Sequence, residues 1–259
     1  NLTGAIITET RFNQAKLLNV IARDLQWNTA LLQGADLSHA QLSGANLQNA
    51  QLEGTLLNEA DLSEASLDGA NLHQAQLKGA RLCKARFNKA TLTQVNLTGA
   101  DLRDVCFDEA NLSGAHLINT QISQVSWNQT NLGDADLTGL DLSGIDFTQV
   151  FVRGTNFSKT ILNHADFEGA ELDGACFMGS RLDQTNFKAT TLVKANFSQA
   201  MGRNTHFEDV RGRGINFDHV QFEGVNFQRG QLEGASFIES QIQNTLFQGA
   251  YLNEAFFKG

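Results

Sequence analysis

The residues of this 259-residue sequence that are best suited to chemistry are its histidines and cysteines. Imidazole and thiolate groups ligate zinc and take part in acid–base and nucleophilic catalysis, but both roles require partners at characteristic spacings. No zinc-ligand spacing, phosphate-binding loop or nucleophile elbow occurs in the chain. The sequence therefore predicts no catalytic residue, no metal site and no cofactor. The residues considered are His39, His73, His116, His164, His206, His219, Cys83, Cys106 and Cys176.

Charged residues are mixed along the chain. The sequence has 19 Lys and Arg against 28 Asp and Glu, a net charge of −9. Because no basic stripe is available to neutralise phosphates, we expect no direct binding of nucleic acid. No apolar run is long enough for a membrane span. One group, Arg203, Arg211 and Arg213, is a candidate basic corner for an acidic partner.

The element that must position these side chains is a five-residue repeat. Residues 35–54 read ADLSH AQLSG ANLQN AQLEG, and a large apolar centre recurs every five residues from Leu2 to Phe257 without insertion or deletion. A small residue lies two positions before each centre, and Gly is frequent two positions after it. A period of five fits neither a helix nor a simple strand. We therefore expect a corner every five residues, with Gly supplying a permissive backbone there.

The aromatic residues indicate how many corners make one coil. Of the 16 Phe at repeat centres, 14 fall into two columns of a 20-residue period, ten residues apart. Four sides per coil place these columns on opposite walls, so we expect Phe to stack on Phe along two walls. The 52 centres, four to a coil, then give about 13 coils. In this arrangement His39 and His219 alone among the histidines share a corner column, nine coils apart, too far to share a metal.

Motifs such as Ala35-Asp36-Leu37-Ser38-His39 and Ala45-Asn46-Leu47-Gln48-Asn49 resemble the pentapeptide repeat family over the whole chain. The resemblance implies an all-β fold, a right-handed quadrilateral parallel β-helix. It also implies a bacterial and cytoplasmic protein, with secretion as an effector an alternative. Some family members inhibit or protect DNA gyrase by presenting a rod that mimics duplex DNA.

We expect residues 1–259 to be a single solenoid domain. Because the chain opens at Asn1 already in repeat phase, we expect it to be a fragment of a longer protein. Near this end Ala22 occupies a centre and Leu25 a small slot. Either the first coil is widened there, or an N-terminal docking edge for another domain is present. The outward apolar residues of that edge are Ile6, Ile21 and Leu31.

Two further departures from the repeat are informative. Gly202 and Gly212 replace core centres, and we expect Phe207, Phe217 and Ile215 to fill the space they leave. In the last coil, outward positions that are polar in earlier coils are apolar instead. They predict a partner surface and a homodimer through the C-terminal coil, or else simple exposure at an open end. These positions are Leu246, Tyr251 and Phe256.

Two functions remain open. The first is a non-catalytic protein-interaction scaffold, part of a bacterial effector or adaptor, which mixed surface charge and the lack of catalytic motifs favour. The second is a DNA mimic that binds gyrase or topoisomerase. Aspartates at 61, 101 and 141 on one face, and at 146 and 166 on another, favour it. Arginines at 81, 181 and 86 interrupt those faces, and a net charge of −9 is modest for a mimic.

Overall fold

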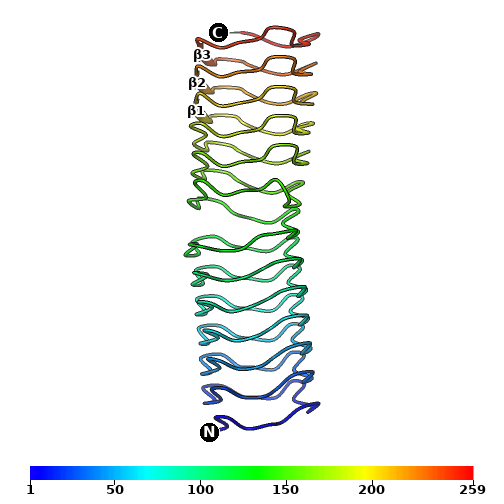
Figure 1. Cartoon of the computed structure of the whole chain (residues 1–259), viewed down its shortest axis with the longest axis vertical. Coiled ribbons are helices and arrows are strands. Elements are labelled where there is room, and N and C mark those ends of the chain that lie inside the picture. Colours follow the sequence, from blue (N-terminus) through cyan, green and yellow to red (C-terminus); the bar gives the residue numbers. More distant parts are fainter. Residues whose placement is uncertain (259) are drawn as a thin grey trace. The chain divides into compact units, whose positions relative to one another are not determined.

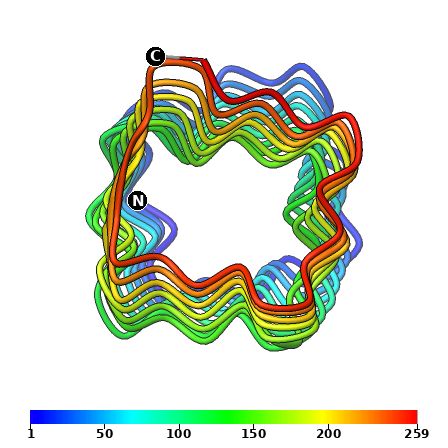
Figure 2. The same cartoon turned by 90° about the horizontal axis from the view of Figure 1, so that it is seen from above.

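The computed structural model describes residues 1–258, which form two compact units: unit 1 (Asn1–Ala135) and unit 2 (Asp136–Gly259). In each unit every coil pairs in parallel with the next through residues 20 apart. Unit 1 runs from the bridge Ile6–Gln26 to the bridge Asn111–Asn131. Unit 2 begins with Asp136–Asn156. Figures 1 and 2 show the stacked coils and the four-sided outline of each unit. The predicted period of 20 is confirmed.

Only one wall of unit 2 carries strands longer than a single bridge among the described residues. They are β1 (Met201–Arg203), β2 (Gln221–Glu223) and β3 (Gln241–Gln243), paired in parallel in the order β1-β2-β3. Elsewhere in residues 1–258 the ladders consist of isolated parallel bridges. No helix of membrane-spanning length and hydrophobicity occurs between residues 1 and 258.

Nearly every corner is a β-turn whose third residue has a positive φ angle. In the turn 32–35, for example, the amide of Ala35 donates to the carbonyl of Leu32, and Gly34 has φ of 65°. Such a φ at this position is the requirement of a type II turn. Gly meets it without strain, but Ala189 (57°) and Lys84 (60°) adopt it as well. The repeat therefore tolerates left-handed backbone at non-glycine residues, where each costs free energy.

Where Asp or Asn lies one position before a centre, its side chain can satisfy a backbone donor. Of five amides per repeat, three bond to neighbouring coils and one closes the turn. The fifth is the amide one residue after the centre. In the repeat around Leu37, the amide of Ser38 donates to Oδ1 of Asp36 over 3.0 Å. In that around Leu62, the amide of Ser63 donates to Asp61 over 3.1 Å. The polar consensus residue thus supplies an acceptor that the ladder lacks.

The core consists of stacked rings, as the aromatic columns predict. Phe87 and Phe107 in unit 1 lie 5.3 Å apart between ring centroids. In unit 2, Phe147 and Phe167 are 4.5 Å apart and nearly parallel, and rings of the two columns meet edge to face, as Phe187 does Phe197 at 5.4 Å. Both geometries are favourable for aromatic pairs. In unit 2 the rings of the two columns therefore meet inside the coils.

At the irregular repeat centres, a neighbouring side chain of complementary size fills the core. Ala22 and Leu25 are both fully buried, so the small and large residues have traded places in that coil. Ile215 packs beside Gly212, as expected. The expectation for Phe207 is wrong: it stays in its stack, 4.9 Å from Phe187. The expectation for Phe217 is also wrong, because the ring nearest to Gly202 belongs to Phe222.

Candidate partner-binding surface

The last coil of unit 2 exposes the apolar side chains that the sequence singled out. Leu246 is 43% exposed, Tyr251 58% and Phe256 60%. They lie on three successive walls, in rows where the preceding coil carries Asn226, Gln231 and Ser236. Within unit 2 these rows otherwise carry polar residues, apart from Phe151 and the thiol-bearing Cys176. The three residues therefore form an apolar rim around the last coil, which we call the C-terminal rim (Leu246, Tyr251 and Phe256).

The last core side chains of unit 2 lie beside the rim. Phe257, a repeat centre, is 56% exposed, and its ring lies edge-on to that of Phe247 at 6.4 Å. A hollow of about 280 Å³ opens there between core side chains. Rim and hollow together offer apolar surface that a partner would remove from water. The hollow is lined by Phe237, Ser240, Ile242, Phe247, Phe257 and Lys258.

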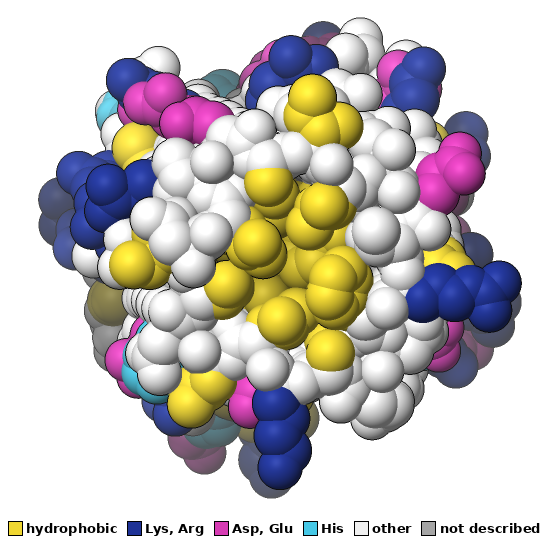
Figure 3. Space-filling model, turned by 90° about the horizontal axis from the view of Figure 1, so that it is seen from below, with side chains coloured by type: hydrophobic (Ala, Val, Ile, Leu, Met, Phe, Trp, Pro, Cys, Tyr) yellow, Lys and Arg dark blue, Asp and Glu magenta, His cyan; other side chains and the backbone are white. Residues whose placement is uncertain are grey.

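The predicted N-terminal docking edge lies on unit 1. Ile6 is 76% exposed and Ile21 39%, whereas Leu31 is mostly buried. They too come from three successive walls, so they do not form one face. Figure 3 shows that apolar side chains gather at the centre of this end and that polar atoms surround them. The partly exposed core residues of the first coil include Leu2, Ile7, Phe12, Leu17 and Val20.

The structure does not bring the three arginines of the predicted basic corner together. Arg203 lies in β1, where its Nε is 3.5 Å from a carboxylate oxygen of Glu223. Arg211 forms β-bridges with Thr191 and Gln231. This row lies half a coil, or ten residues of the 20-residue period, from the row of Met201 and Gln221. Arg213 follows on that same wall. A single acidic group on a partner could not contact all three.

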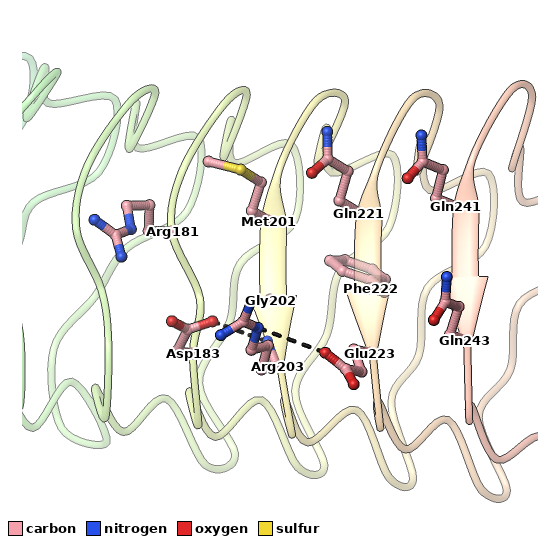
Figure 4. Close-up of a pocket in the computed structure, with 10 residues that line it drawn as sticks. All are labelled: Arg181, Asp183, Met201, Gly202, Arg203, Gln221, Phe222, Glu223, Gln241 and Gln243. Carbon is pink, nitrogen blue, oxygen red and sulfur yellow. Dashed lines mark hydrogen bonds and ion pairs between the residues drawn. The ribbon is translucent and has the colours of Figure 1, made fainter.

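A shallow groove of about 360 Å³ crosses β1, β2 and β3 instead. Figure 4 shows two outward rows of side chains that flank it, with Gly202 and Phe222 between them. Among the described residues, the corners after these strands lack the amide-to-carbonyl bond that closes most other turns, and the wall is extended for three residues before each of them. One row is Arg181, Met201, Gln221 and Gln241, and the other is Asp183, Arg203, Glu223 and Gln243.

Most side chains of this groove are not used by the fold. The exceptions are Asp183, whose Oδ1 accepts from the amide of Arg203 over 3.0 Å, the ion pair of Arg203 with Glu223 and the buried ring of Phe222. The side chains of Gln221 and Gln241 lie side by side in Figure 4 and, within residues 1–258, make no hydrogen bond to protein. The same holds for Gln243. Some outward amides on other walls are bonded within the ladder, as Asn46 is to Gln26 over 3.1 Å, whereas Gln231, among the described residues, makes no such bond.

Ionisable side chains pair along the walls and do not converge. The Nε and Nη2 atoms of Arg103 donate to the carboxylate of Asp101, at 2.8 and 2.7 Å, and these hydrogen bonds lower the pKa of Asp101. Arg229 lowers the pKa of Asp209 in the same way. Burial raises the pKa of Cys106. Within residues 1–258 no three His, Cys, Asp or Glu side chains are grouped as metal ligands would be.

Sequence reasoning missed the groove because it treated Gly202 only as a lost core residue. The residues one position before the centres of this wall did indicate it. Asn and Asp are together the commonest residues one position before the centre, but this wall carries Met201, Gln221 and Gln241 in succession. Long side chains at these positions cannot make the short local bond that Asp36 makes, so they project into solvent.

Comparison with protein families identifies the repeat over most of the sequence. A model of pentapeptide repeats, in eight copies, matches residues 12–49, 28–58, 45–82, 153–188, 180–211 and 215–254. A model of a pentapeptide repeat region matches residues 80–157. No curated protein sequence matches the chain.

Solved structures that resemble the chain include other proteins with this repeat. HetL, a pentapeptide repeat protein involved in heterocyst differentiation regulation in the cyanobacterium Nostoc, is 22% identical; the match covers 98% of this chain and 87% of HetL, with a TM-score of 0.22. Full-length QnrB1, a plasmid-mediated fluoroquinolone resistance protein, is 13% identical over 96% of this chain and 94% of its own, with a TM-score of 0.31. From the family models, the chain belongs to the pentapeptide repeat family and has its right-handed quadrilateral β-helix fold.

Proposed function

We propose that this protein is a non-catalytic interaction scaffold whose principal binding surface is the C-terminal rim. The observation that carries the proposal is the change from polar to apolar residues at that rim. Tyr251 follows Gln231 in one row and Phe256 follows Ser236 in the next. Outward positions of a β-helix need no apolar residue for folding, because the core is filled from inside. Large exposed aromatic side chains are the residues that most often anchor protein interfaces.

The rim suits a protein partner better than a small molecule. Its three residues point outward from different walls and surround the hollow beside Phe257, which is open to solvent. A partner that covers the end of this coil would contact all three residues and the hollow, with the polar walls left in solvent, as at the core and rim of a protein interface. A second copy of this chain is the simplest such partner, because the same ring is then presented by both sides.

Site-specific photo-crosslinking tests the proposal. A photoreactive phenylalanine analogue is placed at Tyr251 or, as the matched control, at Gln231, the residue that precedes it in the same row. We expect protein adducts from position 251 and none from position 231, and an adduct of twice 28.3 kDa reports a second copy. Equal adducts at both positions, or none at either, would contradict a scaffold that binds through the rim.

Ion pairs count against the DNA-mimic alternative. Asp61 and Asp101 lie in one row with Arg81 between them, and Asp101 is held by Arg103. Such pairs cancel the negative potential that a mimic must present. A supercoiling assay with DNA gyrase separates the two functions. We expect no inhibition or protection at micromolar protein, and a clear effect would favour the mimic.

A further inference from the structure

We propose that the groove across β1, β2 and β3 binds a neutral, extended oligosaccharide that lies along the axis of unit 2, between the two rows of side chains. This inference does not depend on the C-terminal rim, which lies on other walls. The two rows of side chains that flank the groove are the starting point. Each of these rows consists of four side chains from successive coils, and Figure 4 shows the two rows in register.

The chemical groups in the groove favour a ligand rich in hydroxyl groups. Gln221, Gln241 and Gln243 each present a carbonyl acceptor and an amide donor, and no protein group within residues 1–258 bonds to them. A hydroxyl group is likewise donor and acceptor, so a pair of neighbouring hydroxyls can satisfy one amide fully. Met201, 42% exposed in the same row, offers an apolar contact for the C–H face of a sugar ring.

The charges in the groove exclude polyanions and polycations. Arg181 and Arg203 are balanced by Asp183 and Glu223, and the nearest pair, Arg203 with Glu223, is 3.5 Å apart. A phosphate or uronate chain that reached the arginines would also meet both carboxylates, at a cost in electrostatic energy. A neutral ligand meets no such penalty and can still bond to all four groups.

The spacing of the rows favours a sugar chain over a peptide. Successive side chains in each row are separated by the strand spacing of about 4.8 Å, whereas an extended peptide advances only about 3.3 Å per residue. A peptide along the groove would therefore lose register after one coil. A pyranose unit in an extended chain has a length close to the strand spacing, so each sugar can meet one pair of facing side chains.

The groove is held in shape before any ligand arrives. Phe222, only 2% exposed, fills the space beneath it and packs against Phe217 with ring centroids 5.8 Å apart. The parallel ladder fixes the register of Gln221 on Gln241. A preformed wall lowers the ordering cost of binding. Because the groove is shallow, we expect affinities in the high micromolar to millimolar range.

Heteronuclear NMR of the whole chain tests this inference with defined probes. Cellohexaose, chitohexaose and mannohexaose are titrated separately, beside hexaglutamate and a short DNA duplex. We expect at least one neutral hexasaccharide to shift the backbone amides of 201–203, 221–223 and 241–243. The double variant Gln221→Ala/Gln241→Ala should weaken that binding about tenfold or more, because two side-chain hydrogen-bonding groups are lost.

Gln231→Ala is the matched control, an exposed glutamine on another wall of the same unit. It should leave the affinity unchanged. The proposal is overturned if no hexasaccharide shifts these amides at millimolar concentration, if the two variants bind alike, or if only hexaglutamate or DNA binds. A folded state is verified for both variants by their unchanged amide spectra outside the groove.

Discussion

In unit 2 the Cε1 atom of Phe222 lies 3.4 Å from the position that a Cβ atom on Gly202 would take, one coil below it in the same column. Phe222 is one of two centre phenylalanines outside the aromatic columns, and Gly202 is one of two glycines at a centre. Each irregularity explains the other. The ring needs more room than a Leu would, and the glycine provides it.

This relationship predicts coupling between the two positions. Gly202→Leu should destabilise unit 2 by about 1–3 kcal/mol, because its Cβ would also lie 2.5 Å from Oγ1 of Thr205. The double variant Gly202→Leu/Phe222→Leu restores the common pattern and should recover part of that loss, with a coupling of about 0.5–3 kcal/mol. Urea unfolding followed by circular dichroism measures both. Strictly additive effects would show that the two residues do not share the space.

The aromatic stack predicts a large effect of ring removal. Phe187 contacts Phe167 and Phe207 in its own column, at 5.1 and 4.9 Å, and two rings of the opposite column edge to face. Phe187→Ala should therefore lower the free energy of unfolding by about 3–5 kcal/mol. Gln231→Ala, on the surface, should change it by less than about 0.5 kcal/mol. A small effect at Phe187, measured by urea unfolding, would mean that the stack contributes little.

Most of the fold follows from the sequence, because the repeat imposes it. The register of five places Phe87 over Phe107, and their ring distance of 5.3 Å confirms the 20-residue coil. The groove did not follow, because the five-residue repeat alone does not show which wall forms three-residue strands. The basic corner failed for a geometric reason, since Arg203 and Arg211 are half a coil apart. The expectation of one unbroken domain over 1–259 stays a prediction.

The backbone conformation at the corners predicts that replacing alanine by glycine has opposite effects on the free energy of unfolding at two positions. Ala189 has φ of 57°, in the left-handed region that strains a residue with a Cβ. Ala189→Gly should raise the free energy of unfolding by about 0.5–1 kcal/mol, after allowance for the greater freedom of Gly in the unfolded chain. Ala195→Gly, at a buried core position, should lower it by about 1 kcal/mol. Thermal unfolding compares the two, and equal signs would contradict this view of the corners.

The pair formed by Asp101 and Arg103 predicts a dependence on pH. Because Arg103 lowers the pKa of Asp101 in the folded state, the pair stabilises the protein above the unfolded-state pKa of about 3.9. That contribution is lost as pH falls through the lower folded-state pKa. The advantage of the wild type over Asp101→Asn should be present at pH 6, at most about 1 kcal/mol for a surface pair, and shrink toward pH 2. Arg103→Gln should behave as Asp101→Asn does, and urea midpoints that differ by the same amount at both pH values would contradict the assignment.

The most direct test of the proposed scaffold is the mass of the whole chain in solution, measured by light scattering. If the C-terminal rim is a binding surface for a second copy, the wild type and the control Gln231→Asp should have twice the monomer mass of 28.3 kDa. The double variant Tyr251→Asp/Phe256→Asp should have the monomer mass, because two charges would have to be buried in the interface. A monomeric wild type at high concentration, or a dimer that the double variant leaves intact, would contradict the account.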